Sequence, residues 1–456
     1  MIALIQNELQ KIFRVKTLVA VGLVLLITTI SIGYISANVI VDTEEDINLA
    51  WEERYQSQID DYTYKLNNDS QNQIDPDTRL QMKTAIEYNE FSLEHGISPG
   101  DWRSSLLSIY FEYKYIPGAE EAAEQYKAIV LENDWKAYYH TLDEDLRAQQ
   151  KNFPENSYGY QSLALDLTIH ALRYQYDIEP SFGSADWKNN LLSEYKMNED
   201  SVLRNTYYID SVPANEIKNL QNENRVILYR LEQNIPEYNV RSFSASMVNS
   251  IYTTTIALIL LVIVAALNMV NEYHYMTIRR LFTFPYHRYK IFLAKCVALL
   301  VFALLAINMS YIFALLSNVM FFNFENPYVV YTLADTVYDL PLLAFVWIKY
   351  NIAIIEVTMY LLITFLLAVL IRNIGISVGV PVALLGIKWT LMRYLSQHYY
   401  LPFLRYIPIA SYDFNQFFGG SILVQGVTMP LAIIITVIST NALLFITLFC
   451  FQKQEM

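Results

Sequence analysis

Few residues of this 456-residue sequence have the types and spacings that enzyme chemistry needs. The sequence contains no phosphate-binding GxxxxGKS/T motif, no HExxH zinc motif and no GxSxG nucleophile motif. Among the six histidines, His274 and His287 flank a basic stretch but lack metal-ligand spacing. Cys296 and Cys450 have no histidine placed in the sequence to activate them. We therefore expect no catalytic residue, no metal and no cofactor, so that any ATP hydrolysis belongs to a separate protein.

One carboxylate, Glu356, interrupts an otherwise apolar run and is the only acid that we place inside a membrane span. An ionisable group in a membrane is a candidate for function because burying its charge there is costly. The expected span puts Glu356 about one turn from its outer end, where a side chain can also reach the interface. We prefer that structural interpretation to a role in transport.

Basic residues cluster between two apolar runs, at Arg279, Arg280, Arg288, Lys290 and Lys295. Such a cluster can be attracted to anionic lipid, by about 1 kcal/mol per basic residue, or it can dock on a partner protein. Lipid attraction alone does not require the ordered residues that accompany the cluster, which are Glu272, Thr277, Pro285 and Arg288. The pattern therefore favours docking.

Six apolar runs are long enough to form membrane-spanning helices, which need about 20 residues each. With 54% hydrophobic and 17% charged residues, the chain is more apolar than soluble domains. We predict an all-α membrane protein with six transmembrane helices and a large helical extracytoplasmic domain between the first two. The expected segments are a cytoplasmic amphipathic helix (1–16), the first span (17–40), the extracytoplasmic domain (41–247), the second span (248–270), a cytoplasmic coupling loop (271–290), the third span (291–319), an outer loop (320–351), the fourth span (352–371), the fifth span (374–391), an outer re-entrant or loop segment (392–430), the sixth span (431–451) and a cytoplasmic tail (452–456).

The orientation follows from basic residues in short loops, which mark the cytoplasmic side. Most of them fall on one side of the cell membrane if both termini are cytoplasmic; Lys388, Arg393 and Arg405 depart from this rule, and we attribute them to long side chains that reach the interface. The first apolar run is longer than the roughly 7–15 residues of a signal-peptide core, which favours a membrane anchor.

The region between the first two spans is strongly acidic. Between Asp42 and Arg241 lie 37 of the 45 carboxylates but only 18 of the 32 lysines and arginines, a net charge of −19. Apolar residues recur at helical spacing, and helices are expected to begin at three similar phrases: Asp101-Trp102, Asp134-Trp135 and Asp186-Trp187. An Asp N-cap followed by a packing aromatic is the structural interpretation, and a repeated ligand motif is the alternative.

The stretch 271–295 resembles the corresponding loop of ABC-2 type permeases, the membrane subunits of bacterial ABC exporters. The matching residues, in order and spacing, are Glu272, Thr277, Ile278, Leu281, Pro285, Arg288, Ile291 and Lys295. Met276 stands where that family has a glycine, which puts the expected tight turn in question. The segment 406–412, the Arg372-Asn373 turn and the order of the spans also resemble this family, whereas the acidic domain resembles nothing that we can name.

The resemblance implies a mechanism. The loop would form the coupling element that docks on a separate ABC ATPase, with Glu272, Thr277, Arg279, Arg280, Pro285 and Arg288 as its coupling residues. The helix at 1–16 has apolar residues along one face and would lie on the inner membrane surface as a second contact. Two permease copies, identical or homologous, would surround the transport pathway, in contact with membrane lipid and with no nucleic acid.

Three function classes are compatible with these features. The first is an ABC exporter permease, possibly one that exports peptides or confers antimicrobial resistance. The second is a membrane receptor or sensor whose outer domain binds a ligand, which the absence of any long predicted cytoplasmic segment disfavours. The third is a membrane enzyme acting on lipid or wall precursors, which the missing catalytic motifs disfavour. The substrate itself is not encoded in any pattern that we recognise.

Overall fold

The computed structural model describes the chain except for residues 39–50, 70–73, 182–185, 239–241, 278–285, 334, 399–401, 421, 423, 425 and 454–456. The chain divides into two compact units. Unit 1 comprises Met1–Val39, Val212–Tyr229 and Glu237–Met456, and unit 2 comprises Ile40–Ser211 and Arg230–Pro236.

Unit 1 contains the apolar helices, a short hairpin and several one-turn elements. Its elements are α1 (Ile2–Ile12), α2 (Val15–Asn38), α12 (Phe243–Asn249), η1 (Ser250–Tyr252), α13 (Thr253–His274), α15 (Arg288–Phe321), β1 (Tyr328–Leu333), β2 (Thr336–Pro341), α16 (Leu342–Ile371), α17 (Ile374–His398), η2 (Pro402–Tyr406), α18 (Pro408–Ser411), η3 (Phe414–Phe417) and α19 (Met429–Gln452). The first part of α11 (Ala214–Gln233) also belongs to this unit.

Among the described residues, five helical stretches are long and apolar enough to cross a membrane: Val15–Asn38, Phe243–His274, Arg288–Phe321, Leu342–Ile371 and Met429–Gln452. They correspond to five of the six expected spans. The remaining one, expected at 374–391, falls in α17, whose apolar part is the shorter stretch Ile374–Lys388. Because α16 begins ten residues before the expected start of its span, Glu356 lies near the middle of that helix rather than one turn from its end.

The all-α prediction needs one correction. Within the predicted outer loop, β1 and β2 form a two-stranded antiparallel hairpin in which Tyr331 is paired with Tyr338. The run Tyr-Val-Val-Tyr-Thr is rich in residues that favour strands. Asp335, in the turn, has a φ of +71°, the left-handed conformation that tight hairpin turns require. The sequence analysis looked for helical spacing and therefore did not recognise this short run as a strand.

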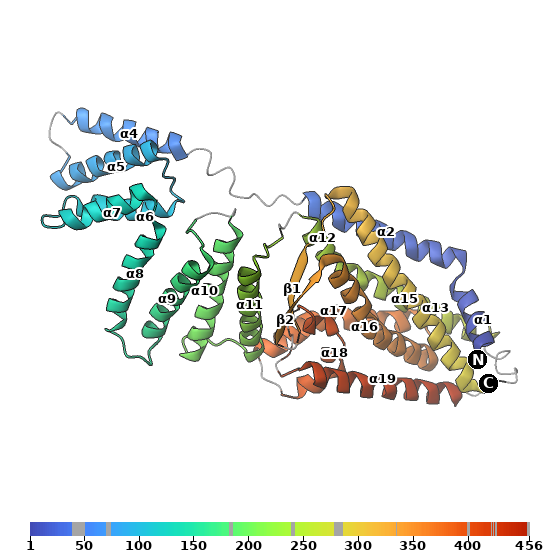
Figure 1. Cartoon of the computed structure of the whole chain (residues 1–456). Coiled ribbons are helices and arrows are strands. Elements are labelled where there is room, and N and C mark those ends of the chain that lie inside the picture. Colours follow the sequence, from blue (N-terminus) through green and yellow to red (C-terminus); the bar gives the residue numbers. More distant parts are fainter. Residues whose placement is uncertain are drawn as a thin grey trace. The chain divides into compact units, whose positions relative to one another are not determined.

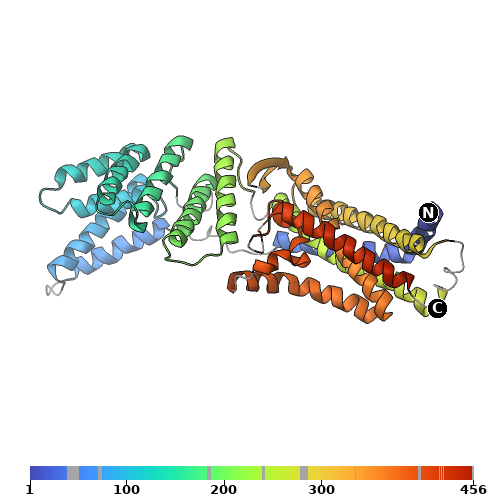
Figure 2. The ribbon, with the colours of Figure 1, turned by 90° about the horizontal axis from the view of Figure 1, so that it is seen from below.

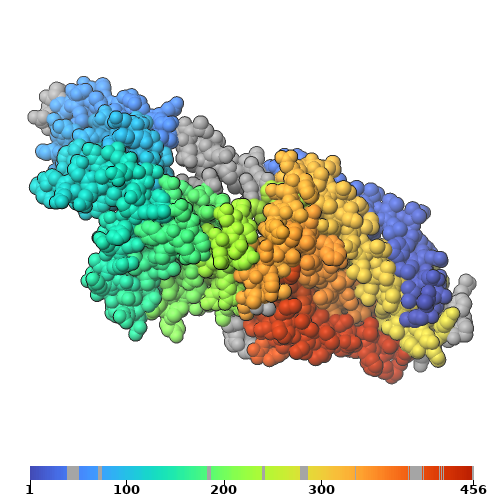
Figure 3. All heavy atoms as spheres, in the orientation of Figure 1, coloured from blue at the N-terminus to red at the C-terminus, as the bar shows by residue number. Residues whose placement is uncertain are grey.

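The helices of unit 1 pack closely around a shared apolar core. In the space-filling view, α1 and α2 lie against α15 (Figure 3), and Figure 2 shows α19 running along α15. A Cβ added to Gly33 of α2 would come within 2.8 Å of Ser317 Oγ on α15, so this glycine allows a close approach of the two helices. Ser317 Oγ donates to the carbonyl oxygen of Thr29 at 3.0 Å, which ties α2 to α15.

The chain's N-terminus and the ends of several helices lie close together at one end of unit 1. The N-terminus, the end of α13, the start of α15 and the end of α19 lie together there in both ribbon views (Figures 1 and 2). Arg288 Nη1, at the start of α15, donates to the carbonyl oxygen of Gln452 in α19 at 2.8 Å. We call this region the inner end of unit 1, after the side of the membrane on which the sequence leads us to expect both termini.

In unit 2, helices that follow one another in the chain pack against each other (Figure 1). Its helices are α4 (Trp51–Asn67), α5 (Pro76–His95), α6 (Trp102–Tyr113), α7 (Glu120–Glu132), α8 (Trp135–Gln150), α9 (Tyr158–Tyr176) and α10 (Trp187–Thr206), with the end of α11. The helical interpretation of this region is confirmed for the described residues.

The three Asp-Trp phrases begin helices as predicted. The side chains of Asp101, Asp134 and Asp186 each accept hydrogen bonds from backbone N–H groups of the first turns of α6, α8 and α10. The indole of Trp102 is buried and stacks on Tyr138, with ring centroids 5.4 Å apart. The geometry therefore supports the structural interpretation of these phrases, a cap followed by an aromatic that packs.

Candidate functional site

The N-terminal helix α1 is amphipathic and packs against the membrane helices. Ile12 is buried, and Leu9 and Phe13 pack partly buried against the core of unit 1. The ring of Phe13 meets that of Phe302 on α15 edge to face at 5.4 Å. Ile2, another apolar residue of this helix, is 74% exposed. The apolar face thus faces α15 over the second half of α1.

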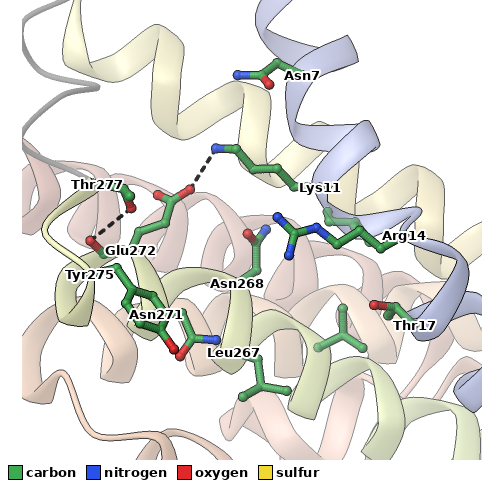
Figure 4. A pocket seen from close by; sticks show the side chains of 12 residues that line it. Asn7, Lys11, Arg14, Thr17, Leu267, Asn268, Asn271, Glu272, Tyr275 and Thr277 are labelled. Atoms are coloured by element: carbon green, nitrogen blue, oxygen red, sulfur yellow. Dashed lines mark hydrogen bonds and ion pairs between the residues drawn. The ribbon is translucent and has the colours of Figure 1, made fainter.

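A buried group of four charged residues lies at the inner end of unit 1. We call Glu8, Lys11, Glu272 and Lys295 the inner charge cluster. Lys295 Nζ lies 2.8 Å from Glu8 Oε2 and 2.7 Å from Glu272 Oε1, and its side chain is fully buried. Lys11 Nζ lies 2.7 Å from Glu8 Oε1 and 2.9 Å from Glu272 Oε1; Figure 4 shows the latter contact. Two ammonium groups therefore alternate with two carboxylates.

The cluster is electrically neutral, which makes its burial possible. Burial alone would raise the pKa of Glu8, but the ammonium groups of Lys295 and Lys11 hold that pKa below its usual value. Because α1 supplies Glu8, α13 supplies Glu272 and α15 supplies Lys295, the cluster fixes three helices to one another. The helices on either side of residues 278–285, α13 and α15, are thereby joined to the N-terminal helix.

The expected coupling residues fall into two groups. Glu272, Thr277 and Arg288 are described, and Thr277 Oγ1 donates to the carbonyl oxygen of Glu272 at 3.3 Å. Arg279, Arg280 and Pro285 lie outside the described residues. Of the first group, only Glu272 joins the inner charge cluster, because Arg288 contacts α19 instead.

Met276 takes up the turn that the family's glycine would favour. Its φ is +55°, in the left-handed region, and its backbone N–H donates to the carbonyl oxygen of Tyr273 at 3.2 Å. A tight turn after α13 is thus present without the glycine, although a side chain in this conformation carries a steric cost.

A second charge cluster lies within the helices of unit 1 and comprises Glu356, Lys388 and Asp413. Lys388 Nζ is 2.7 Å from Glu356 Oε1 and 3.2 Å from Asp413 Oδ2. Lys388 is 2% exposed, so the prediction that it reaches the interface is wrong. Glu356 likewise pairs with an opposite charge instead of facing the interface. The attraction between the ammonium group and the two carboxylates offsets part of the free-energy cost of burying them. That cost would be higher for each charged group buried alone.

A polar cavity of about 370 Å³ adjoins the second charge cluster. Glu356 and Asp413 line it together with Lys349, whose Nζ lies 3.5 Å from the carbonyl oxygen of Gly419. Tyr252 and Thr255 contribute further hydroxyl groups to its wall. The cavity thus offers groups of both charges inside a unit made of apolar helices.

Two participants, Glu8 and Asp413, were missed by the sequence analysis. Glu8 lies between Ile5 and Ile12 on the apolar face of α1, and an acid in that position was a usable signal of a buried partner. Asp413 had no comparable signal, because it lies in an irregular segment. In the described part of the chain, no group of three or more His, Cys, Asp or Glu residues is arranged to hold a metal ion.

Comparison with known proteins gives a family and one distant relative. A family model described as "ABC-2 family transporter protein" matches residues 2–456. A Bacillus subtilis (strain 168) protein named "Uncharacterized protein YhcI" is 25% identical over 235 residues, which cover 50% of this chain and 73% of that protein. No solved structure gives a significant match.

Proposed function

The chain belongs to the ABC-2 family of transporter proteins, and from this membership we propose that it is the permease subunit of an ABC exporter. Members of the family are integral membrane components of transport and not enzymes themselves; in general they work with ABC ATPases. The proposal assigns to this chain the transmembrane pathway and to a separate protein the hydrolysis of ATP.

The observation that carries the proposal is the inner charge cluster. Force applied to residues 278–285 would reach α13 and α15, which precede and follow them in the chain, and α1 through Glu8. A neutral, buried set of ion pairs transmits such a displacement because separating its charges is costly. Glu272, Thr277, Arg279, Arg280, Pro285 and Arg288 are proposed as the residues that couple this end to the ATPase.

Six crossings are proposed, with α17 as the fifth. Arg372, directly after α16, lies over the ring of Tyr273 at 5.1 Å, which puts the end of α16 at the inner end of unit 1. α19 also ends there, so the chain must return to the opposite end between Arg372 and Met429. In the described part of that segment, α17 is the long helix available for the return.

The proposed orientation puts both termini and the loop 271–290 in the cytoplasm. The cluster of basic residues at the inner end supports this through the excess of lysine and arginine that cytoplasmic loops carry. Residues 41–247 then form an extracytoplasmic domain, and a second permease copy or a homologue completes the pathway.

Cationic peptides are the proposed substrate class, with export or resistance as the outcome. The charge of −19 between residues 42 and 241 would attract cationic species over long range.

The test is a charge reversal in the proposed coupling loop. The double variant R279E/R280E is compared with R147E/K151E, which makes the same change in charge near the end of α8. The full chain is purified with its ATPase, and ATP-driven peptide uptake is measured in inside-out vesicles. Loss of both ATPase association and uptake in the loop variant alone supports the proposal. Retention of both in the loop variant would contradict it.

A further inference from the structure

A cavity of about 510 Å³ opens between α1, the turn before α2 and α13 (Figure 4). We call it the inner cavity. Its wall includes Arg14, Thr17, Leu267, Asn268, Glu272 and Tyr275. The inner charge cluster closes one side, since Lys11 and Glu272 both line the cavity. The cavity is thus separate from the polar cavity beside Glu356.

The wall of the inner cavity changes from apolar to polar along α13. Val264 and Leu267 line the part inside the apolar helix, and Glu272 lines the part near its inner end. Eight residues separate Val264 from Glu272, which is about 12 Å along a helix. Leu267 is 38% exposed, and the neighbouring α2 exposes Val19 and Leu23. Such a gradient fits an amphiphile with its polar group at the inner end.

Two buried polar atoms of the cavity residues are left without a hydrogen-bond partner in the described part of the chain. They are Glu272 Oε2 and Asn268 Nδ2. Glu272 is 7% exposed, so water alone does not easily satisfy its second oxygen. Arg14 points into the same space toward Asn268 (Figure 4). An occupant must therefore accept hydrogen bonds from Asn268 and Arg14 and donate one to Glu272.

The charges around Glu272 determine which kind of hydrogen-bond donor can contact its second oxygen. Glu272 Oε1 already receives hydrogen bonds or ion pairs from the ammonium groups of Lys11 and Lys295. A third cation beside them would be repelled, whereas a neutral hydroxyl would not. The inner charge cluster has no net charge, so Arg14 leaves the cavity with a single positive charge. A phosphodiester supplies the matching negative charge.

We propose that the inner cavity binds the headgroup of a glycerophospholipid that combines a phosphodiester with free hydroxyl groups, as phosphatidylglycerol does. Arg14 and Asn268 hold the phosphate, and Glu272 accepts a hydrogen bond from a headgroup hydroxyl. The acyl chains follow Leu267 and the exposed apolar side chains of α2 into the membrane. The bound lipid would bridge α1 and α13 and so support a helix that directly precedes the proposed coupling residues. This binding does not depend on the ATPase or on the transported substrate.

The test uses native mass spectrometry of the full chain in detergent, titrated with phosphatidylglycerol. Phosphatidylethanol, with the same charge but no headgroup hydroxyl, tests the contact with Glu272, and phosphatidylcholine tests the charge requirement. Soluble glycerol 3-phosphate, added as a competitor, distinguishes a lipid site from a site for a free phosphate ester. The variants are R14Q and N268L, with K16Q as the matched control, because Lys16 does not line the cavity.

We expect phosphatidylglycerol to bind at least about tenfold more tightly than either other lipid, a difference of about 1.4 kcal/mol. R14Q and N268L should each remove most of this preference, and K16Q should keep it. Glycerol 3-phosphate should not displace the lipid. Equal retention of phosphatidylglycerol and phosphatidylethanol, or equal loss in R14Q and K16Q, would overturn the proposal, as would displacement by the soluble ester.

Discussion

Lys295 Nζ lies 2.7 Å from Glu272 Oε1, and the two residues belong to the consecutive membrane helices α15 and α13. The same ammonium group reaches Glu8 of the N-terminal helix at 2.8 Å. A single fully buried cation thus connects two consecutive membrane helices to the distant N-terminal helix. Because Lys295 holds these pairs together, a substitution there tests the stability of this end of unit 1 most directly.

Replacing Lys295 with methionine should destabilise the protein strongly. The change leaves Glu8 and Glu272 buried beside one remaining cation, and removing one partner of a buried ion pair costs about 3–5 kcal/mol. Thermal unfolding of the full chain in detergent measures the effect. K16M, a change at an exposed lysine, is the control and should shift the midpoint little. A midpoint for K295M equal to that of K16M would contradict the assigned role of the cluster.

The second charge cluster allows a test of charge balance. K388M leaves Glu356 and Asp413 without their shared cation, so we expect loss of monodisperse protein or a clearly lower unfolding temperature. The triple variant E356Q/K388M/D413N removes all three charges and should recover part of the loss. Size-exclusion chromatography and thermal unfolding distinguish the variants. If the triple variant is no better than K388M, the ion pairs are not what stabilises this region.

A substitution at Met276 should stabilise the protein, unlike the substitutions at Lys295 and Lys388. Its φ of +55° is a conformation that glycine adopts without steric cost. M276G should therefore raise the free energy of unfolding, by up to about 1 kcal/mol. Met197 lies within α10, where glycine is unfavourable by about 1 kcal/mol, so M197G should lower it. Both values come from unfolding curves; a destabilised M276G would show that the turn needs the methionine side chain.

The stability of unit 2 should depend on pH through His170. Burial lowers the pKa of His170 although its Nδ1 lies 2.5 Å from Asp143 Oδ1. At a pH between the lowered value and the usual value near 6.5, the unfolded chain binds a proton that the folded protein does not. Stability should therefore fall as the pH drops below about 6.5.

The measurement is the unfolding temperature between pH 8 and pH 5, in wild-type protein and in H170Q. Below about pH 6.5, H170Q should lose part of the pH dependence of the unfolding temperature. Above that pH, its unfolding temperature should vary with pH as that of the wild type does. An unchanged dependence in H170Q would mean that other groups carry it.

Local signals in the sequence were sufficient for much of the fold. The helices expected after Asp101, Asp134 and Asp186 are observed, and each of these side chains caps its helix as predicted. These features depend on neighbouring residues: helical spacing of apolar positions and an oxygen next to free N–H groups. The apolar spans have the same local origin.

The candidate sites were only partly predictable. Glu272 and Lys295 were found through the family resemblance, but Lys295 contacts Glu8, which lies 287 positions away, and Glu272 contacts Lys11, which lies 261 positions away. Lys388 was assigned to the interface because the sequence around a single basic residue near the end of a span does not identify its ion-pair partner. Its contacts with Glu356 and Asp413 arise from packing between α16, α17 and an irregular segment. Tertiary contacts of this kind have no periodic signature in the chain.

The central claim is that this chain is one part of a transporter whose ATPase is a separate protein. Its most direct test is affinity purification of the tagged full-length chain from its native membranes, followed by mass spectrometry of what is retained. The account predicts an ABC ATPase in a stoichiometric amount and ATP hydrolysis by the complex that the permease alone lacks. A homogeneous, stable preparation that transports its substrate without any ATPase subunit would contradict the account.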